Sequence, residues 1–335
     1  MKRPDSDRKL SKRPDRIRQY LIHFMDDFLF DEFTEAYLKS GKLENMMRGV
    51  PIPLRKEDAE AFRGGKGLPV TLIGENMARV IGIDPKFRHA EAYEAFLLRF
   101  LGRRVADTLV RNAKQYADSG DYEAACIHFR AALVLKPEDP AAMYGYARIC
   151  RAMYNKSADA VYTGNFKAES LDYLEMLTEL HPKFGQGWYY LGYMYLNLGL
   201  YTKACLAWES FLPLSRIAKD RREIELRMEQ IRTPMEIERG CNAALAGRWE
   251  ESAHILEPFA DSVYKDWWPL WHYLGEAYLH TDRRDKAKEA FHRVLALNAT
   301  HTGTMETLIV LYEEEENPGM VKKYRDKIAL LRENG

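Results

Sequence analysis

Apolar residues along most of the chain recur with the 3.6-residue period of an amphipathic helix. In the stretch "WYYLGYMYLNLGLYTKACLAW" (188–208), one stripe is made by Trp188, Leu191, Gly192 and Tyr195. Gly199 then interrupts the pattern, and a second stripe runs through Ala204, Trp208, Phe211 and Leu212. Two short amphipathic helices joined by a tight turn are therefore predicted, which together make a helical hairpin.

The same arrangement occurs at 271–295 and at 109–137. In all three copies a tyrosine lies nine residues before a small residue of the second helix: Tyr116 to Ala125, Tyr195 to Ala204 and Tyr278 to Ala287. A unit of this length that recurs along a chain is typical of a helical repeat array. The pattern therefore predicts stacked hairpins.

The segments "WYYLGYMY" and "WHYLGEAY" resemble the tetratricopeptide repeat, whose Trp-x-x-Leu-Gly-x-x-Tyr signature both contain. The small and aromatic positions of its second helix match Ala125 and Phe129, and its closing proline matches Pro137. The resemblance implies an all-α, right-handed solenoid of helical hairpins over residues 105–335, with about six repeats. Three repeats match strongly, and three are degenerate, at 141–181, 234–260 and 302–332.

Glycine inside a helix costs roughly 1 kcal/mol relative to alanine, so Gly192 needs a compensating contact. A missing side chain lets the paired helix approach closely. We therefore interpret the surrounding aromatic residues mainly as core and not as a cofactor-binding box. The strong repeats are also spaced more widely than the roughly 68 residues of two plain repeats, which predicts longer helices or insertions near 152–163 and 214–233.

Residues 1–104 do not fit the repeat. Residues 1–13 are polar and basic, which predicts a disordered tail. Residues 14–104 are predicted to form a smaller helical domain, in which one amphipathic helix spans 14–39 and further helices span about 56–62, 70–81 and 86–101.

The segment "MRGVPIPLR" (47–55) contains two prolines and predicts an extended conformation. Linker or edge packing is the favoured interpretation. The alternative is a self-ligand that lies in the groove of the repeats.

Composition adds limits on partners and compartment. The 335 residues include 50 lysines and arginines and 50 aspartates and glutamates, a balance that gives no overall attraction to nucleic acid or anionic lipid. The four cysteines are scattered without a CxxC pair and lie beside apolar residues, which favours buried free thiols. No apolar run approaches the roughly 20 residues of a membrane span, so membrane insertion is not expected and a cytoplasmic location is.

No motif for chemistry stands out. The nine histidines form no HExxH motif, and His272 and His280 are too far apart on one helix to share a metal. Signatures of a nucleophile with its base are also missing. The sequence therefore predicts no catalytic residue, no metal site and no cofactor.

What remains is the inner surface that the first helices of such hairpins form. The positions that flank the packing stripe are Lys114, Tyr144, Arg148, Arg151, Tyr189, Tyr193, Asn197, His272 and Glu276. Tyrosine and arginine together suit a peptide with apolar and acidic character. Some family members grip a C-terminal carboxylate with Lys and Asn, but Val110 and Lys114 stand at those positions here, which disfavours such a clamp.

The predicted function is a non-catalytic adaptor or scaffold that binds a peptide or protein partner in this groove. RNA binding by the same face is one alternative, although neutral overall charge disfavours it and no nucleic acid is expected as a partner. An enzyme with its site in residues 14–104 is the other.

Overall fold

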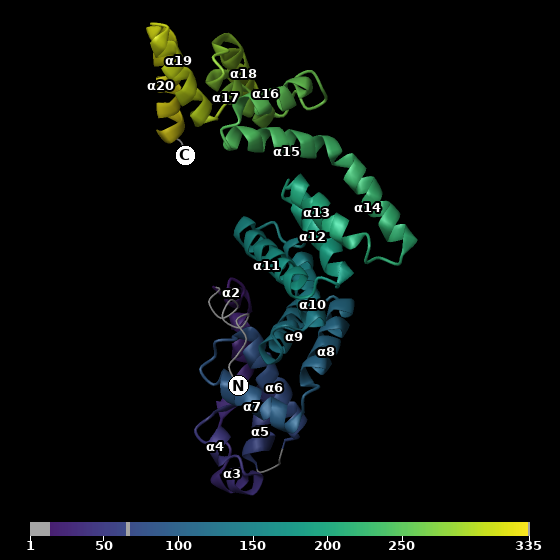
Figure 1. Ribbon diagram of the computed structural model, residues 1–335. Coiled ribbons are helices and arrows are strands. Elements are labelled where there is room, and N and C mark those ends of the chain that lie inside the picture. The colour runs from purple at the N-terminus through teal and green to yellow at the C-terminus, as the bar shows by residue number, and fades with distance from the viewer. Residues whose placement is uncertain (1–13, 65–67, 334–335) are drawn as a thin grey trace. The chain divides into compact units, whose positions relative to one another are not determined.

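The structure is a computed structural model that describes residues 14–64 and 68–333. The chain divides by internal contacts into two compact units, Met1–Leu191 and Gly192–Gly335 (Figure 1). The tail predicted at residues 1–13 lies outside the described residues.

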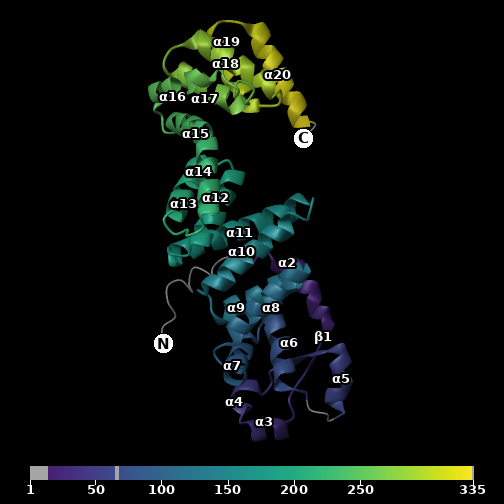
Figure 2. The ribbon, with the colours of Figure 1, turned by 90° about the vertical axis from the view of Figure 1, so that its right-hand side faces the viewer.

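The N-terminal unit begins with a short helical segment and a two-stranded antiparallel sheet. Its strands, β1 (Phe28–Asp31) and β2 (Ile52–Arg55), lie beside α5 and α6 (Figure 2). The other elements before the repeats are α2 (Arg18–Leu21), the 3₁₀ helix η1 (Ile22–Asp27), α3 (Glu35–Gly41), α4 (Glu44–Met47), α5 (Lys56–Arg63), α6 (Val70–Ile83) and α7 (Ala90–Phe100).

The single helix predicted over 14–39 is wrong. After α2 and η1 the backbone becomes extended at Phe28, and β1 pairs with β2, so that Phe28 faces Arg55 and Asp31 faces Ile52. Aromatic residues suit strands as well as helices, and a short apolar run does not distinguish the two. The strand partner lies too far along the chain for local periodicity to detect.

The extended conformation predicted for 47–55 is confirmed for residues 52–55, which form β2, whereas Met47 ends α4 and the next two residues form a turn. In a two-stranded sheet this segment is an edge strand. Its backbone is held by two side chains: Asn76 Nδ2 donates to the carbonyl of Pro53 (3.1 Å), and the Tyr93 hydroxyl donates to that of Pro51 (2.5 Å). Proline cannot donate to a ladder, so an edge strand is the place in a sheet that tolerates it.

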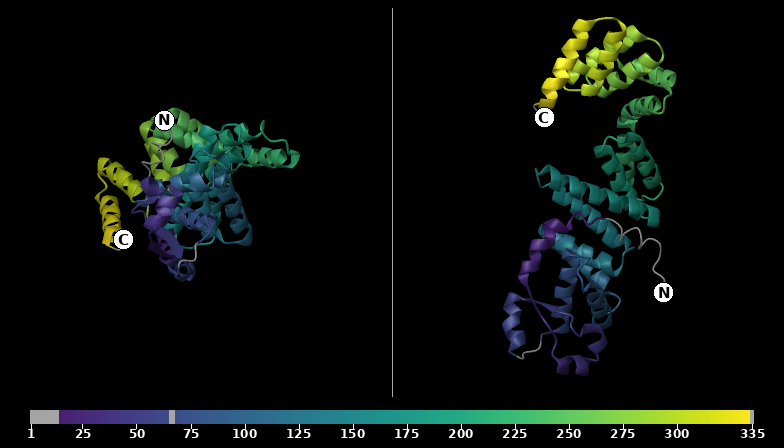
Figure 3. Two further views of the ribbon diagram at one scale, coloured as in Figure 1. Left: turned by 90° about the horizontal axis from the view of Figure 1, so that it is seen from below. Right: turned by 90° about the vertical axis from the view of Figure 1, so that its left-hand side faces the viewer.

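Six successive helix pairs follow in the part of the chain that the structure describes, and the predicted all-α fold of helical hairpins is confirmed (Figure 3). The pairs are α8 (Val105–Ser119) with α9 (Tyr122–Leu135), α10 (Pro140–Tyr154) with α11 (Ala160–Leu180), α12 (Gly185–Asn197) with α13 (Tyr201–Phe211), α15 (Arg232–Leu245) with α16 (Trp249–Leu256), α17 (Trp268–His280) with α18 (Arg284–Leu297), and α19 (Thr302–Glu314) with α20 (Pro318–Glu333).

The extra residues between repeats have two sources. The long helix α11 spans 21 residues, and the further helix α14 (Ala218–Gln230) lies between α13 and α15. A short 3₁₀ helix, η2 (Glu257–Phe259), follows α16. The longer helices or insertions predicted near 152–163 and 214–233 are thus present.

Helical glycines mark where paired helices approach most closely. A Cβ added at Gly192 would lie 2.2 Å from the indole nitrogen of Trp208, and one at Gly275 would lie 2.7 Å from the Phe291 ring. Trp208 and Phe291 are both fully buried. In each case the ring fills the space that a side chain on the facing helix would occupy. The interpretation as core is therefore confirmed for Trp208, whereas Trp188 and Tyr195 are only half-buried.

Each of the two signature tryptophans donates a hydrogen bond to a backbone carbonyl that precedes it in the chain. The indole N–H of Trp188 donates to the carbonyl of Pro182 (2.8 Å), and that of Trp271 donates to the carbonyl of Lys265 (2.7 Å). Both acceptors lie six residues upstream. The tryptophan of this repeat therefore has a hydrogen-bonding role in addition to its packing area.

We expect Gly192→Ala to lower the free energy of unfolding by roughly 1–3 kcal/mol, because the new Cβ overlaps the Trp208 ring. Urea denaturation followed by tryptophan fluorescence would measure the change. Gly303→Ala is the matched control, since a Cβ at that helical position meets nothing closer than 3.5 Å. An equal loss in both variants would contradict the close approach.

Two ion pairs connect Asp15 and Arg16, which precede α2, to helices α9 and α11. The Arg130 guanidinium on α9 is buried, and Nη2 donates to Asp15 Oδ2 at 2.6 Å. Arg130 Nε donates to the carbonyl of Gly82 on α6 at 2.7 Å. Arg16 pairs with Asp172 of α11 at 2.7 Å. Residues 15 and 16 are therefore held against α9 and α11 by ion pairs, although neither side chain is fully buried.

Candidate functional site

Two tyrosines and two arginines gather on α10 and on the part of α12 that belongs to the N-terminal unit. We call Tyr144, Arg148, Arg151 and Tyr190 the α10–α12 patch. The Arg148 guanidinium carbon lies 5.6 Å from the centre of the Tyr144 ring and 5.5 Å from that of Tyr190. Arg151 lies 5.5 Å from the same Tyr190 ring. These distances are within the roughly 6 Å of a cation–π contact.

The sequence of α10 places three of these residues on one face. Tyr144, Arg148 and Arg151 are four and three residues apart, so they project from one side of the helix. The helix begins at Pro140, and the Asp139 carboxylate before it accepts hydrogen bonds from the backbone N–H groups of residues 141 and 142. An aspartate cap followed by proline is a strong helix start.

Further rings hold the tyrosines in place. Tyr144 lies 5.4 Å from Phe184 and 5.7 Å from Tyr190, and Tyr189 packs edge-on against Tyr190 at 5.2 Å. Burial, reinforced by the neighbouring Tyr190 and opposed by Arg148, raises the pKa of Tyr144 to about 12. The phenol is therefore neutral at neutral pH and can donate a hydrogen bond.

This arrangement suits recognition of an acidic group next to an apolar one. Arg148 is exposed, whereas the two tyrosines and Arg151 are half-buried. An arginine stacked on a ring keeps the N–H groups at the edge of its plane, and these can donate to a carboxylate. The rings beside it offer flat contact area that loses little side-chain entropy on binding.

Tyr190 was missed by the sequence prediction, which assigned Tyr189 to the surface. The two are adjacent, and a helix turns by about 100° per residue, so the stripe alone did not decide between them. The position of Gly187 could have helped to decide which of the two tyrosines faces outward. That glycine is buried against Leu177 and Thr178, so it marks the packed side of α12.

The other predicted positions are spread over both units. In the N-terminal unit, Lys114 is exposed on α8. In the C-terminal unit, Asn197 is exposed at the end of α12, and Tyr193 is engaged within the protein. The Tyr193 hydroxyl donates to Glu223 on α14 at 2.5 Å, and its ring meets Trp208 edge-on at 5.2 Å. Tyr193 thus helps to hold α14.

His272 and Glu276 lie on α17 among side chains of their own unit. The His272 ring lies 5.1 Å from that of His301, and burial together with His301 lowers the pKa of His272. Burial raises the pKa of Glu276, although His280 at 4.0 Å acts in the opposite direction. His280 in turn stacks on Trp249 at 4.0 Å. These contacts give His272 a packing role.

The described part of the chain contains neither a cluster of metal-binding side chains nor a helix that could cross a membrane. No group of three or more histidine, cysteine, aspartate or glutamate side chains among them could hold a metal ion. In residues 14–64 and 68–333, no helix combines the length and the apolar character needed to cross a membrane.

Comparison with known proteins decides the family resemblance. The model of the tetratricopeptide repeat family matches residues 268–301, which include "WHYLGEAY". The predicted resemblance is confirmed. Among curated proteins, none is similar enough in sequence to count as a match.

Several solved structures of tetratricopeptide repeat proteins are similar in fold. A crystal structure of MamA shares 16% identity over 69% of this chain and 93% of its own, with a TM-score of 0.29. The P58(IPK) TPR domain shares 18% sequence identity over 68% of this chain and 60% of its own, with a TM-score of 0.38. YrrB, described as a TPR protein with an unusual peptide-binding site, shares 14% sequence identity over 70% of this chain and 98% of its own, with a TM-score of 0.32. Likeness at this level says nothing about what this chain binds.

Proposed function

We propose that the protein is a non-catalytic interaction module that binds a peptide or partner protein through the α10–α12 patch. The observation that carries this proposal is the set of cation–π contacts, at 5.5–5.6 Å, that Arg148 and Arg151 make with the rings of Tyr144 and Tyr190. Lys114 and Tyr189 extend the same surface in the proposal. Asn197, His272 and Glu276 stay predictions for the C-terminal unit.

The preferred ligand is a segment that carries Asp or Glu beside a large apolar residue. Arginine and tyrosine are among the residues that dominate interface energies, because each combines a wide contact area with a hydrogen bond at its tip. Stacking also reduces the side-chain freedom that Arg148 would lose on binding. A basic peptide would instead bring like charges together.

The test uses the full chain and fluorescent peptides of equal length, one set rich in Asp, Glu, Leu and Phe and the other with Lys in place of the acids. We expect only the acidic set to bind. Arg148→Ala should weaken binding roughly 30-fold, which corresponds to about 2 kcal/mol for an interface anchor. Fluorescence anisotropy would measure both affinities.

Arg103→Ala is the matched control, since Arg103 is exposed in the same unit outside the patch. If the two variants lose the same peptide affinity, the loss reflects the overall charge of the protein and not the patch, and the proposal that the patch binds the peptide is wrong. Labelled oligouridine tests the RNA alternative: tight binding that falls steeply between low and moderate salt would favour RNA over a peptide.

The proposal includes the cytoplasm as its compartment. Cys126, Cys150, Cys205 and Cys241 are free thiols, and Cys126, Cys150 and Cys241 are buried. Thiols persist in this form where the surroundings are reducing.

A further inference from the structure

A polar hollow of about 370 Å³ lies in the N-terminal unit, apart from the α10–α12 patch. Residues of β2, α6, α8 and α9 line it: Arg55, Glu75, Arg79, Asn112, Gln115, Tyr116, Ser119 and His128. Its volume is within the roughly 300–1,000 Å³ of small-molecule sites. Most of these side chains can donate hydrogen bonds, and Glu75 is the carboxylate in the set.

Arg79 is the side chain whose surroundings most call for an anion. Its Nε atom is buried and has no hydrogen-bond partner among the described residues. Leaving a buried donor unsatisfied costs roughly 1–3 kcal/mol, and more for a charged group. Burial lowers the pKa of Arg79, and the positive charge of Arg55 lowers it further, while Tyr116, Asp27 and Asp121 act in the opposite direction.

The His128 ring, which also lines the hollow, brings no negative charge to it. His128 Nδ1 lies 2.7 Å from the carbonyl oxygen of Ala124, which can only accept, so Nδ1 carries the proton. Burial, together with the charge of Arg79, lowers the pKa of His128, and the ring is therefore neutral at neutral pH. Its face lies 4.8 Å from Tyr116, which leaves an aromatic wall beside the two arginines.

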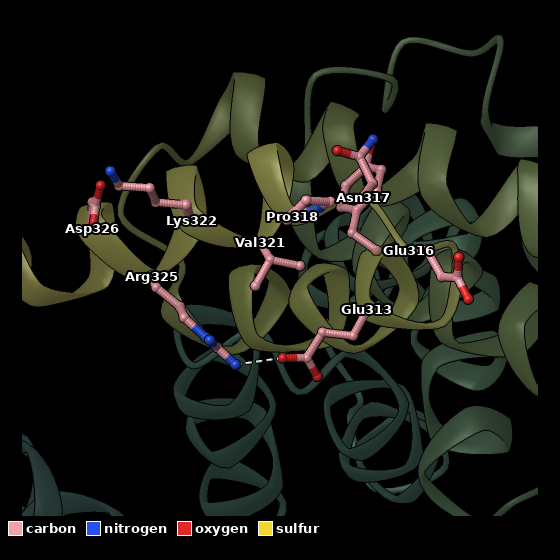
Figure 4. Close-up of a pocket in the computed structure, with 9 residues that line it drawn as sticks. Glu313, Glu316, Asn317, Pro318, Val321, Lys322, Arg325 and Asp326 are labelled. Carbon is pink, nitrogen blue, oxygen red and sulfur yellow. Dashed lines mark hydrogen bonds and ion pairs between the residues drawn. The ribbon is translucent and has the colours of Figure 1, made fainter.

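A second hollow, at the α19–α20 turn, can be compared with the one around Arg79 (Figure 4). It is larger, at about 500 Å³. One of its cations, Arg325, donates to the Glu313 carboxylate of the same hairpin (Figure 4). The hollow of the N-terminal unit differs in composition, because two guanidinium groups, Arg55 and Arg79, line it with the single carboxylate Glu75.

We propose that the hollow between β2, α6 and α8 binds the phosphate group of a small phosphomonoester, which Arg55 and Arg79 hold. Such a group carries about −1.5 to −2 charges at neutral pH and several acceptor oxygens, which matches two guanidinium groups better than a single carboxylate does. Asn112, Gln115 and Ser119 on α8 can donate to the remaining oxygens. The Tyr116 and His128 rings accommodate the organic part.

The test titrates the full chain with phenyl phosphate, inorganic phosphate and benzoate at constant ionic strength, by calorimetry. We expect phenyl phosphate to bind most tightly, inorganic phosphate more weakly and benzoate least. Arg79→Gln should weaken the binding of phenyl phosphate at least tenfold. Arg79→Lys should recover only part of that affinity, because lysine keeps the charge but lacks the paired N–H donors of a guanidinium group.

Arg103→Gln is the control and should leave phenyl phosphate affinity unchanged. If Arg79→Gln melts at a lower temperature than wild type, Arg55→Gln provides a second variant, in a residue of β2 that also lines the hollow. Unchanged affinity in both variants, benzoate binding as tight as phenyl phosphate, or no binding at millimolar concentration would each overturn the proposal. Peptide binding by the α10–α12 patch uses none of these residues, so the two proposals can fail separately.

Discussion

Gly82→Ala is expected to destabilise the N-terminal unit by about 3 kcal/mol, at or above the upper end of ordinary overpacking. A Cβ at this position would lie 2.1 Å from the carbonyl oxygen of Ile127 on α9. That neighbour is backbone, which cannot turn aside as a side chain can. The two helices would have to move apart, and the hydrogen bond from Arg130 to the Gly82 carbonyl would be strained with them.

Hydrogen exchange measured by mass spectrometry would locate the effect, with peptides from α6 and α9 losing protection before those of the C-terminal unit. Gly164→Ala is the control in the same unit, because a Cβ at that position in α11 meets nothing within 4 Å. We expect it to be neutral or to stabilise by up to roughly 1 kcal/mol, as alanine favours a helix. Similar losses in both variants would contradict a backbone contact at Gly82.

The repeats could be predicted because their evidence is local. Trp188, Gly192 and Tyr195 recur at the same spacing as Trp271, Gly275 and Tyr278, so one hairpin supports the interpretation of the next. The front segment lacks such repetition. Its strand pairing joins residue 28 to residue 55, and a periodic pattern within one segment carries no information about that partner.

The candidate site could be predicted only in part, for a related reason. Arg148 and Arg151 follow from the face of α10 alone, but Tyr190 comes from another helix, and its choice over Tyr189 depends on the exact rotation of α12. The hollow around Arg79 depends on four elements that meet only in the folded chain. Neither Arg55 nor Arg79 belongs to a recognisable motif, so tertiary packing was needed to bring them together.

The second large effect concerns the ion pair between Asp15 and Arg130. Asp15→Ala is expected to lower the free energy of unfolding by roughly 3–5 kcal/mol, because it leaves the buried Arg130 guanidinium without its closest carboxylate. Asp172→Ala is the matched control. Its partner Arg16 is 30% exposed, and loss of such a pair should cost about 1 kcal/mol or less. Urea denaturation followed by circular dichroism would compare the two.

Acid should remove this difference. Burial alone would raise the pKa of Asp15, but the hydrogen bonds and charge of Arg130 outweigh it, so the folded pKa lies below the ordinary 3.8. A carboxylate with a lowered folded pKa stabilises fully above its unfolded pKa and loses that contribution as pH falls through the folded value. Burial raises the pKa of nearby Glu169, and the charge of Asp15 also raises it. Protonation of Glu169 therefore relieves wild type slightly more than Asp15→Ala, which opposes the loss at Asp15 without replacing it. The gap between wild type and Asp15→Ala should therefore be constant above about pH 5 and narrow below it. A gap that stays constant down to about pH 2 would show that Asp15 acts through packing and not through its charge.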